Sequence, residues 1–228
     1  MLGGEVGDRG DVVEGAHRRR DDRLLPGRLS YDILGTVPVA EVEIDVRVTR
    51  PGRTIELVEA TMAHAGRDIV RLRAWLTQRL DNASLEGTPL PRLRPPGELE
   101  PWDPTSVWPG GFIDSIELRR DQEQPGRARF WARTATPLLD EPVREVARFT
   151  GLLDIANGMT VRVAPTAVAF PNLDLTVHYL AEPRGEWVGF DTSVSFGATG
   201  LGLTSSIVHD EHGPVGAVAQ SLTVRPSG

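Results

Sequence analysis

The chain has 228 residues, of which 39% are hydrophobic and 25% charged, a composition typical of a globular protein with one large domain or two small ones. Its net charge is −7 and no basic stripe marks a nucleic-acid surface, so a nucleic-acid partner is not expected. The lack of cysteine excludes disulfides, thiolate metal sites and a cysteine nucleophile, and the lack of both a signal-peptide pattern and an apolar run of about 18 residues predicts a cytoplasmic protein without a membrane span.

The N-terminal part divides into an irregular segment and a first structural unit. Residues 1–27 mix glycine, aspartate and arginine without helical or strand periodicity, which predicts disorder. Alternation of polar and apolar residues then predicts three strands, over residues 41–50, 54–63 and 69–77. We assign residues 28–85 to this first unit.

A proline-rich stretch separates the first unit from the rest of the chain. Residues 86–111 contain seven prolines, and because proline removes a backbone donor and fixes φ, this stretch is expected to be a linker. Beyond it, residues 112–119 and 127–134 predict a hairpin across a Gln-Pro-Gly turn. Residues 112–228 therefore form the expected second unit.

One amphipathic helix is expected in the second unit, between residues 143 and 156. Its apolar positions recur near helical spacing: Val143, Val146, Ala147, Phe149, Thr150, Leu153, Ile155 and Ala156. Pro142 is tolerated in the first turn, and Asn157-Gly158 supplies the expected stop.

The last quarter of the chain repeats the layout of the first unit. Residues 171–225 follow the same order of strands and turns as residues 28–78, which indicates one supersecondary unit used twice. Three positions differ in chemistry: the second copy has Asp174, Ser195 and Gln220 where the first has Ser30, Arg50 and Arg73. A polar set on only one copy predicts a duplicated fold with a single kind of site.

These elements predict an α+β protein in which a curved antiparallel sheet wraps one apolar helix, the arrangement of the hotdog fold. Two such units would make a double hotdog, with two antiparallel sheets that each wrap a central helix. The first unit has the strands without a matching helix, so its central helix is expected to be missing or altered.

Three segments of the second unit carry a family resemblance. Residues 173–178, 191–195 and 217–221 resemble, in order and spacing, segments of the double-hotdog acyl-CoA thioesterases of the thioesterase II type. The resemblance extends over residues 28–226, and the N-terminal loop typical of that family has no counterpart in residues 1–27.

The resemblance implies hydrolysis of a fatty acyl-CoA to a free acid and CoA. Asp174 corresponds to the base that activates water, and Ser195 and Gln220 to the residues that position that water. The resemblance implies acyl-CoA as the substrate, and neither a metal nor a dissociable cofactor.

Strand alternation extends the expected site. Asp174, Thr176 and His178 share one face of their strand, so Thr176 and His178 are candidate substrate-binding residues beside the base. The apolar set on the other face is expected to cover the helix: Leu173, Leu175, Val177 and Tyr179.

Other functions remain open at this point. An incomplete first unit suits a non-catalytic acyl-CoA or lipid binder, whereas a hotdog hydratase is disfavoured because the spacing from Asp174 to His178 is one residue too short. The groove left by a missing helix predicts a homo-oligomer, because exposed apolar grooves tend to be covered by a partner. Residues 209–212 (His-Asp-Glu-His) are expected to form a solvated turn rather than a metal site.

Overall fold

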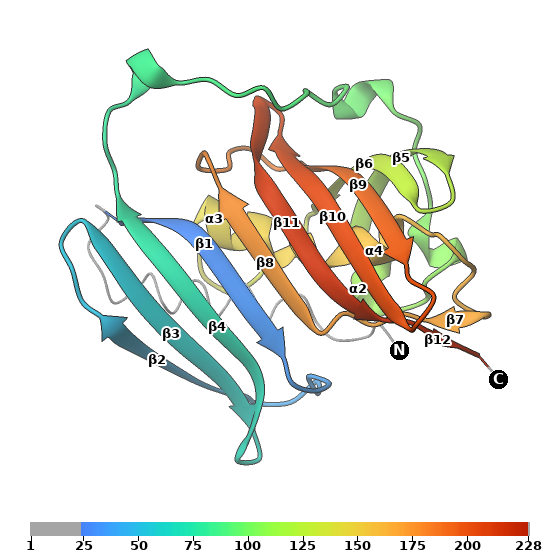
Figure 1. The fold of residues 1–228 in the computed structure, drawn as a ribbon, viewed down its shortest axis with the longest axis horizontal. Helices are drawn as coiled ribbons and strands as arrows, with labels where there is room; N and C mark the ends of the chain where they lie inside the picture. Colours follow the sequence, from blue (N-terminus) through green and yellow to red (C-terminus); the bar gives the residue numbers. More distant parts are fainter. Residues whose placement is uncertain (1–23, 228) are drawn as a thin grey trace.

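The computed structural model describes residues 24–227. Ten of its strands form one antiparallel sheet in the order β2-β3-β4-β1-β8-β11-β10-β9-β6-β5 (Figure 1). Their bounds are β1 Leu24–Ile33, β2 Glu43–Arg50, β3 Ile55–His64, β4 Arg67–Gln78, β5 Ile116–Gln124, β6 Arg127–Thr134, β8 Asp174–Tyr179, β9 Val188–Phe196, β10 Leu201–Asp210 and β11 Gly213–Thr223. The two sheets expected from the sequence are therefore continuous.

The two halves of the sheet join where β1 pairs with β8. Leu29 lies opposite Val177, and Tyr31 lies opposite Leu175. All four side chains are at most 1% exposed, so the junction is closed by apolar packing. Strand β1 begins at Leu24, four residues before the expected start of the first unit, so the prediction of disorder is wrong for residues 24–27. For residues 1–23 that prediction lies outside the described part of the chain, as does the expectation of a missing or altered first helix.

The expected linker is a coil with short helical turns that arches from β4 to β5 (Figure 1). These turns are η1 Ala83–Leu85, η2 Pro96–Glu98 and η3 Pro104–Ser106. The predicted strand over residues 112–119 is wrong at its start, because the four-residue helix α2 (Gly111–Asp114) precedes β5. Phe112 and Ile113 are apolar because this helix packs them against the core, not because they alternate in a strand.

The expected central helix is broken into three short pieces. They are α3 (Glu145–Gly151), the 3-10 turn η4 (Leu153–Ile155) and α4 (Ala156–Met159). Thr150 Oγ1 donates to the Val146 carbonyl at 2.5 Å, a contact that bends helices, and the Leu152 amide then bonds three residues back to Phe149. Phe149 and Leu153 are 4% and 0% exposed, which confirms that this segment is buried.

The helical segment lies on one face of the sheet, which we call the helix face; the opposite side is the open face (Figure 1). The end of α4 is held by three side chains that donate to backbone carbonyls: Trp108 to Gly158 at 2.7 Å, Arg120 to Met159 at 3.1 Å and Gln122 to Val161 at 2.6 Å. Burial lowers the pKa of Arg120 to about 10. These contacts satisfy carbonyls that a helix end leaves unpaired.

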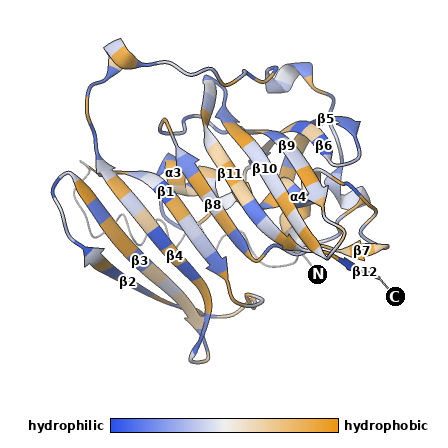
Figure 2. Ribbon diagram, viewed as in Figure 1, coloured by the Kyte–Doolittle hydropathy of each residue, from blue (hydrophilic) through white to orange (hydrophobic). Residues whose placement is uncertain are grey.

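A small two-stranded sheet pairs β7 (Val168–Ala169) with β12 (Arg225–Pro226) beside the C-terminus. Figure 2 shows the alternation of hydrophobic and hydrophilic residues along β3 and β4 that the sequence patterns anticipated. Within residues 24–227, no helix is long and apolar enough to cross a membrane.

Candidate active site

A buried glutamine at the centre of the sheet organises the candidate site. Gln220 lies on the helix face of β11 and is 1% exposed. Its Nε2 donates to Asp154 Oδ1 at 3.1 Å, and Asp154 belongs to the 3-10 turn η4. A residue of the sheet and a residue of the broken helix thus meet through a charge-assisted hydrogen bond.

Asn172 supplies a second amide to the same carboxylate. Its Nδ2 donates to Asp154 Oδ1 at 2.6 Å, and its side chain is 9% exposed. An isolated backbone bridge to Leu222, two residues from Gln220 on β11, fixes Asn172 just before β8. Two amide donors, one on β11 and one just before β8, therefore orient one oxygen of the Asp154 carboxylate.

The orientation of the Gln220 amide leaves its oxygen available. If the amide were reversed, Gln220 Oε1 would face the Asp154 carboxylate, and two hydrogen-bond acceptors would repel each other. Electrostatics therefore favour the arrangement in which Nε2 faces the carboxylate. Gln220 Oε1 is then buried without a hydrogen-bond partner among residues 24–227, as is the hydroxyl of Thr204, its cross-strand neighbour on β10. Because an unpaired buried acceptor costs about 1–3 kcal/mol, this corner of the core suits a small donor such as water.

Asp174, the expected base, has a different contact. Its Oδ1 accepts a hydrogen bond from the Ser221 backbone N–H at 2.6 Å, and Asp174 pairs with Asp32 across the β1–β8 junction. Leu175 and Val177 are buried on the helix face, as expected from alternation, while Leu173 is 51% exposed and does not cover the helix. The Asp174 carboxylate therefore holds the backbone of β11 from the open face.

The other expected site residues also lie on the open face. Ser195 is exposed and pairs with Leu203, while its neighbour Val194 is buried on the helix face. Thr176 Oγ1 shares a hydrogen bond with Ser30 Oγ at 2.9 Å, and His178 is exposed. Of the three residues expected to act together, only Gln220 contacts Asp154. Asn172 is the second residue that contacts this carboxylate, while Asp174 and Ser195 lie on the open face.

The sequence holds a signal for one of the two residues that were missed. Asp154 interrupts the apolar run from Leu152 to Ala156, so it sits where the amphipathic pattern requires an apolar or small residue. For Asn172 the sequence gives only an amide two residues before Asp174 in a regular alternation, and the burial of both Asn172 and Leu175, three positions apart, is seen only in the structure. Nothing in the sequence specifies that both residues meet Gln220.

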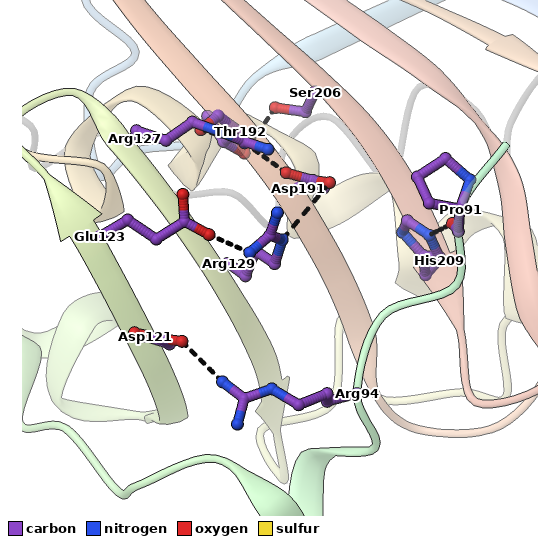
Figure 3. A network of polar contacts seen from close by, with 10 residues as sticks. All are labelled: Pro91, Arg94, Asp121, Glu123, Arg127, Arg129, Asp191, Thr192, Ser206 and His209. Carbon is purple, nitrogen blue, oxygen red and sulfur yellow. Dashed lines mark hydrogen bonds and ion pairs between the residues drawn. The ribbon is translucent and has the colours of Figure 1, made fainter.

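The segment from His209 to His212 has a structural role. Asp210 Oδ1 accepts hydrogen bonds from the backbone N–H groups of His212 and Gly213, which fixes the turn. His209 is 1% exposed rather than solvated, its Nε2 bonds the Pro91 carbonyl of the linker at 2.9 Å, and burial lowers its pKa (Figure 3). Among the residues the structure describes, no cluster of three potential metal ligands occurs.

A charged network lies on the open face near this segment (Figure 3). Asp191 of β9 pairs with Arg127 and Arg129 of β6, and Arg129 also pairs with Glu123. The network ties β5, β6 and β9 together on the side of the sheet away from Gln220.

Comparison with known proteins identifies the family. Residues 94–224 match the model of the acyl-CoA thioesterase C-terminal domain, and residues 12–77 match that of the acyl-CoA thioesterase N-terminal domain. No curated protein matches the chain.

Solved structures share the fold at low sequence identity. An acyl-CoA thioesterase II from Mycobacterium marinum superposes with a TM-score of 0.75 at 19% identity, over 96% of this chain and 88% of that one. A hot dog fold protein of unknown function from Alicyclobacillus acidocaldarius gives a TM-score of 0.79 at 18% identity, over 100% and 89%. A putative thioesterase II from Thermobifida fusca gives 0.72 at 19% identity, over 96% and 86%. With both of its domain models matched along the sequence, the chain belongs to the acyl-CoA thioesterase family.

Proposed function

We propose that this protein is a double-hotdog thioesterase that hydrolyses an acyl-CoA to a free acid and CoA, with water activated by Asp154. Family membership supports the reaction class. The observation that carries the choice of base is the convergence of Asn172 and Gln220 on one oxygen of Asp154, at 2.6 and 3.1 Å.

The chemistry follows from a carboxylate, a water and a thioester. Asp154 accepts a proton from water while the water oxygen attacks the thioester carbonyl carbon. The tetrahedral intermediate collapses, the carbon–sulfur bond breaks, and the proton on Asp154 passes to the CoA thiolate. No metal or dissociable cofactor takes part in these steps, and the acyl-CoA is the only partner that they require.

Asn172 and Gln220 are assigned to positioning. Their amide N–H groups hold the carboxylate in one orientation, and Gln220 Oε1 accepts the second hydrogen of the attacking water. That water then directs a lone pair at the carbonyl carbon, an arrangement that lowers the entropic part of the barrier. A half-buried carboxylate without these two amides would lack this orientation.

This assignment replaces the pair first expected from the resemblance. Asp174 accepts from Ser221 N–H at 2.6 Å on the open face, and Ser195 is exposed on that same face. A base and a water-positioning group must share one cavity within hydrogen-bond reach. Asp174 and Ser195 are therefore assigned to the sheet scaffold, and Thr176 with its Ser30 contact joins the halves.

The reaction is tested by turnover in ¹⁸O-labelled water. Acyl-CoAs with short, medium and long chains are incubated with the protein, and the released thiol and the labelled acid are measured. The proposal predicts equal amounts of thiol and acid, one label per acid molecule, and rates unaffected by a chelator. Binding of acyl-CoA without release of thiol from any substrate would instead establish a non-catalytic acyl-CoA binder.

A further inference from the structure

A row of buried hydroxyl groups continues from the candidate site beneath α4, which lies over β9 and β10 (Figure 1). Thr204 and Ser206 lie on the helix face of β10, and Thr192 of β9 lies opposite Ser206 on the same face. Thr192 and Thr204 are 0% exposed, and Ser206 is 2% exposed. Together with Gln220 and Thr160, these residues form what we call the polar seam. Apolar residues are typical of such fully buried strand positions, so the seam is unusual for a core.

Three atoms of the polar seam are buried without a partner. Gln220 Oε1, Thr204 Oγ1 and Thr160 Oγ1 make no hydrogen bond among residues 24–227. An unpaired buried polar atom costs about 1–3 kcal/mol, so three such atoms in one seam indicate a small ligand that can both donate and accept hydrogen bonds. The groups of the seam are neutral hydroxyls and one amide, which do not balance the charge of a buried ion. Water has the required size and hydrogen-bonding capacity.

The inner end of the polar seam is at the candidate base. Thr204 lies opposite Gln220 on the neighbouring strand, and Gln220 Nε2 donates to Asp154 Oδ1 at 3.1 Å. Side chains of directly opposite residues have Cβ atoms about 4.5–5.5 Å apart. A water that bonds at about 2.8 Å on each side joins groups up to about 5.6 Å apart, so a single water can bridge Gln220 Oε1 and Thr204 Oγ1.

The outer end of the polar seam is at β5, the last strand of the sheet. Thr192 lies opposite Ala128 of β6, and Ala128 lies opposite Gln122 of β5. Ala128 presents only a methyl group between Thr192 and Gln122. Gln122 is partly exposed, and its Nε2 donates to the Val161 carbonyl at 2.6 Å, which holds the adjacent Thr160 near this end. The seam therefore extends from the base to a side chain that contacts solvent.

The middle of the polar seam supplies both a donor and acceptors. Thr192 Oγ1 and Ser206 Oγ share a hydrogen bond of 2.7 Å, which uses one of their two hydroxyl hydrogens and leaves the other for a further acceptor. Ser206 follows Thr204 by two residues on the same face of β10, a distance of about 6.7 Å between Cα atoms. One or two waters suffice to join Thr204 to the hydroxyl pair.

We propose that the polar seam holds a file of buried waters that supplies the water consumed at Asp154. This inference rests on the proposed function, in which each hydrolysis of a thioester consumes one water. A bound acyl-CoA excludes solvent from its own side of the site. The seam is then the side from which water reaches Asp154 while the substrate is bound.

The proposal is tested by an X-ray structure of the wild type at a resolution that shows ordered water, together with thiol-release kinetics. Waters are expected within about 3.2 Å of Gln220 Oε1, Thr204 Oγ1 and Thr160 Oγ1. Thr204→Val keeps the shape of the side chain and removes the hydroxyl, so this variant should lose the water at Thr204. Its kcat should fall about 3- to 10-fold with KM unchanged, and Thr204→Ser should retain both the water and the rate.

Two further variants keep the test decisive. Thr160→Val removes a hydroxyl at the outer end and should lower kcat in the same way. The control is Thr134→Val on β6, where the Thr134 hydroxyl donates to the Ser115 carbonyl at 2.9 Å outside the seam; this variant should keep the wild-type kcat.

The two measurements separate this inference from the proposed function. A dry seam in the wild type would overturn the proposal, and so would unchanged kcat in both Thr204→Val and Thr160→Val. If the wild type releases no thiol from any acyl-CoA, waters at the three atoms still establish the seam as a hydrated site, and only its role in supplying the reaction is refuted with the proposed function.

Discussion

Replacing Gln220 by methionine should separate activity from stability. Methionine has a similar length and keeps the side chain apolar, so Gln220→Met removes the amide without opening a large cavity. The lost Nε2 donor is one of two that orient Asp154, at 3.1 Å. A hydrogen bond to a charged group contributes about 1.5–3 kcal/mol, which corresponds to a fall in kcat of roughly 10- to 100-fold if all of it acts in the transition state.

The free energy of unfolding should change much less. Gln220 Oε1 is buried without a partner among the described residues, and relieving such an atom returns about 1–3 kcal/mol. That gain is similar in size to the lost hydrogen bond, so the net change should lie within about 1 kcal/mol. A catalytic role thus predicts a side chain whose removal costs activity but little stability.

Urea unfolding and thiol-release kinetics of the same preparations measure both quantities. The matched control is Val218→Ala, on the same strand and the same buried face, where Val218 is 2% exposed. The loss of two methyl groups there should cost about 2 kcal/mol while kcat per folded molecule is retained. The reasoning fails if Gln220→Met loses more than about 3 kcal/mol of stability and keeps its turnover.

Three further predictions concern the scaffold. A Cβ added to Gly216 would lie 2.2 Å from the His178 carbonyl oxygen, whereas a Cβ added to Gly97 would meet nothing within 4 Å. Gly216→Ala should therefore lower the urea midpoint by the equivalent of about 1–3 kcal/mol, and the control Gly97→Ala should leave the midpoint unchanged. Burial lowers the pKa of His209 below its ordinary 6.5, so below about pH 6.5 the unfolded chain binds a proton that the native imidazole does not, and the free energy of unfolding of the wild type should fall. In that pH range the difference in the free energy of unfolding between the wild type and His209→Gln should shrink. A difference that stays constant with pH would contradict the assignment. Trp108→Phe removes the indole donor to the carbonyl at the end of α4 and should cost about 1 kcal/mol of stability by thermal unfolding, against no loss if that bond is replaced by water.

Local patterns predicted the regular parts of the fold. Strands β2, β3 and β4 lie within two residues of the predicted ranges, and β6 matches its range, because one face of each strand is more buried than the other along much of its length. The start of β5 was wrong because a short apolar helix has too few residues to show its own period. The helix broken after Gly151 was predicted as continuous, because the apolar stripe is the same for a straight and a bent segment.

The site was predicted only in part. Alternation assigns the residues of a strand to two faces, but it does not decide which polar residue lies on the face that packs against the helical segment. Gln220 was expected as a residue that positions water, and it is the one member of the expected set of three that lies beside Asp154. Asp174 was expected as the base from the family resemblance of residues 173–178 and from its absence in the first copy, but an irregularity between Asn172 and Leu175 turns the face of the chain, so that Asp174 lies on the open face. The partnership of Asp154 with Gln220 joins residues 66 positions apart, which no local pattern contains.

The most direct test of the proposed site compares two aspartates under identical conditions. The kcat/KM of Asp154→Asn and Asp174→Asn is measured against the wild type with the best acyl-CoA substrate, using a thiol reagent that detects only released CoA because the chain has no cysteine. Removing a general base lowers the rate by about two to four orders of magnitude, so Asp154→Asn should lose about 10²–10⁴-fold. Asp174→Asn should stay within a few-fold of the wild type, because its amide oxygen can still accept from Ser221 N–H. A large loss in Asp174→Asn together with full activity in Asp154→Asn would contradict the account.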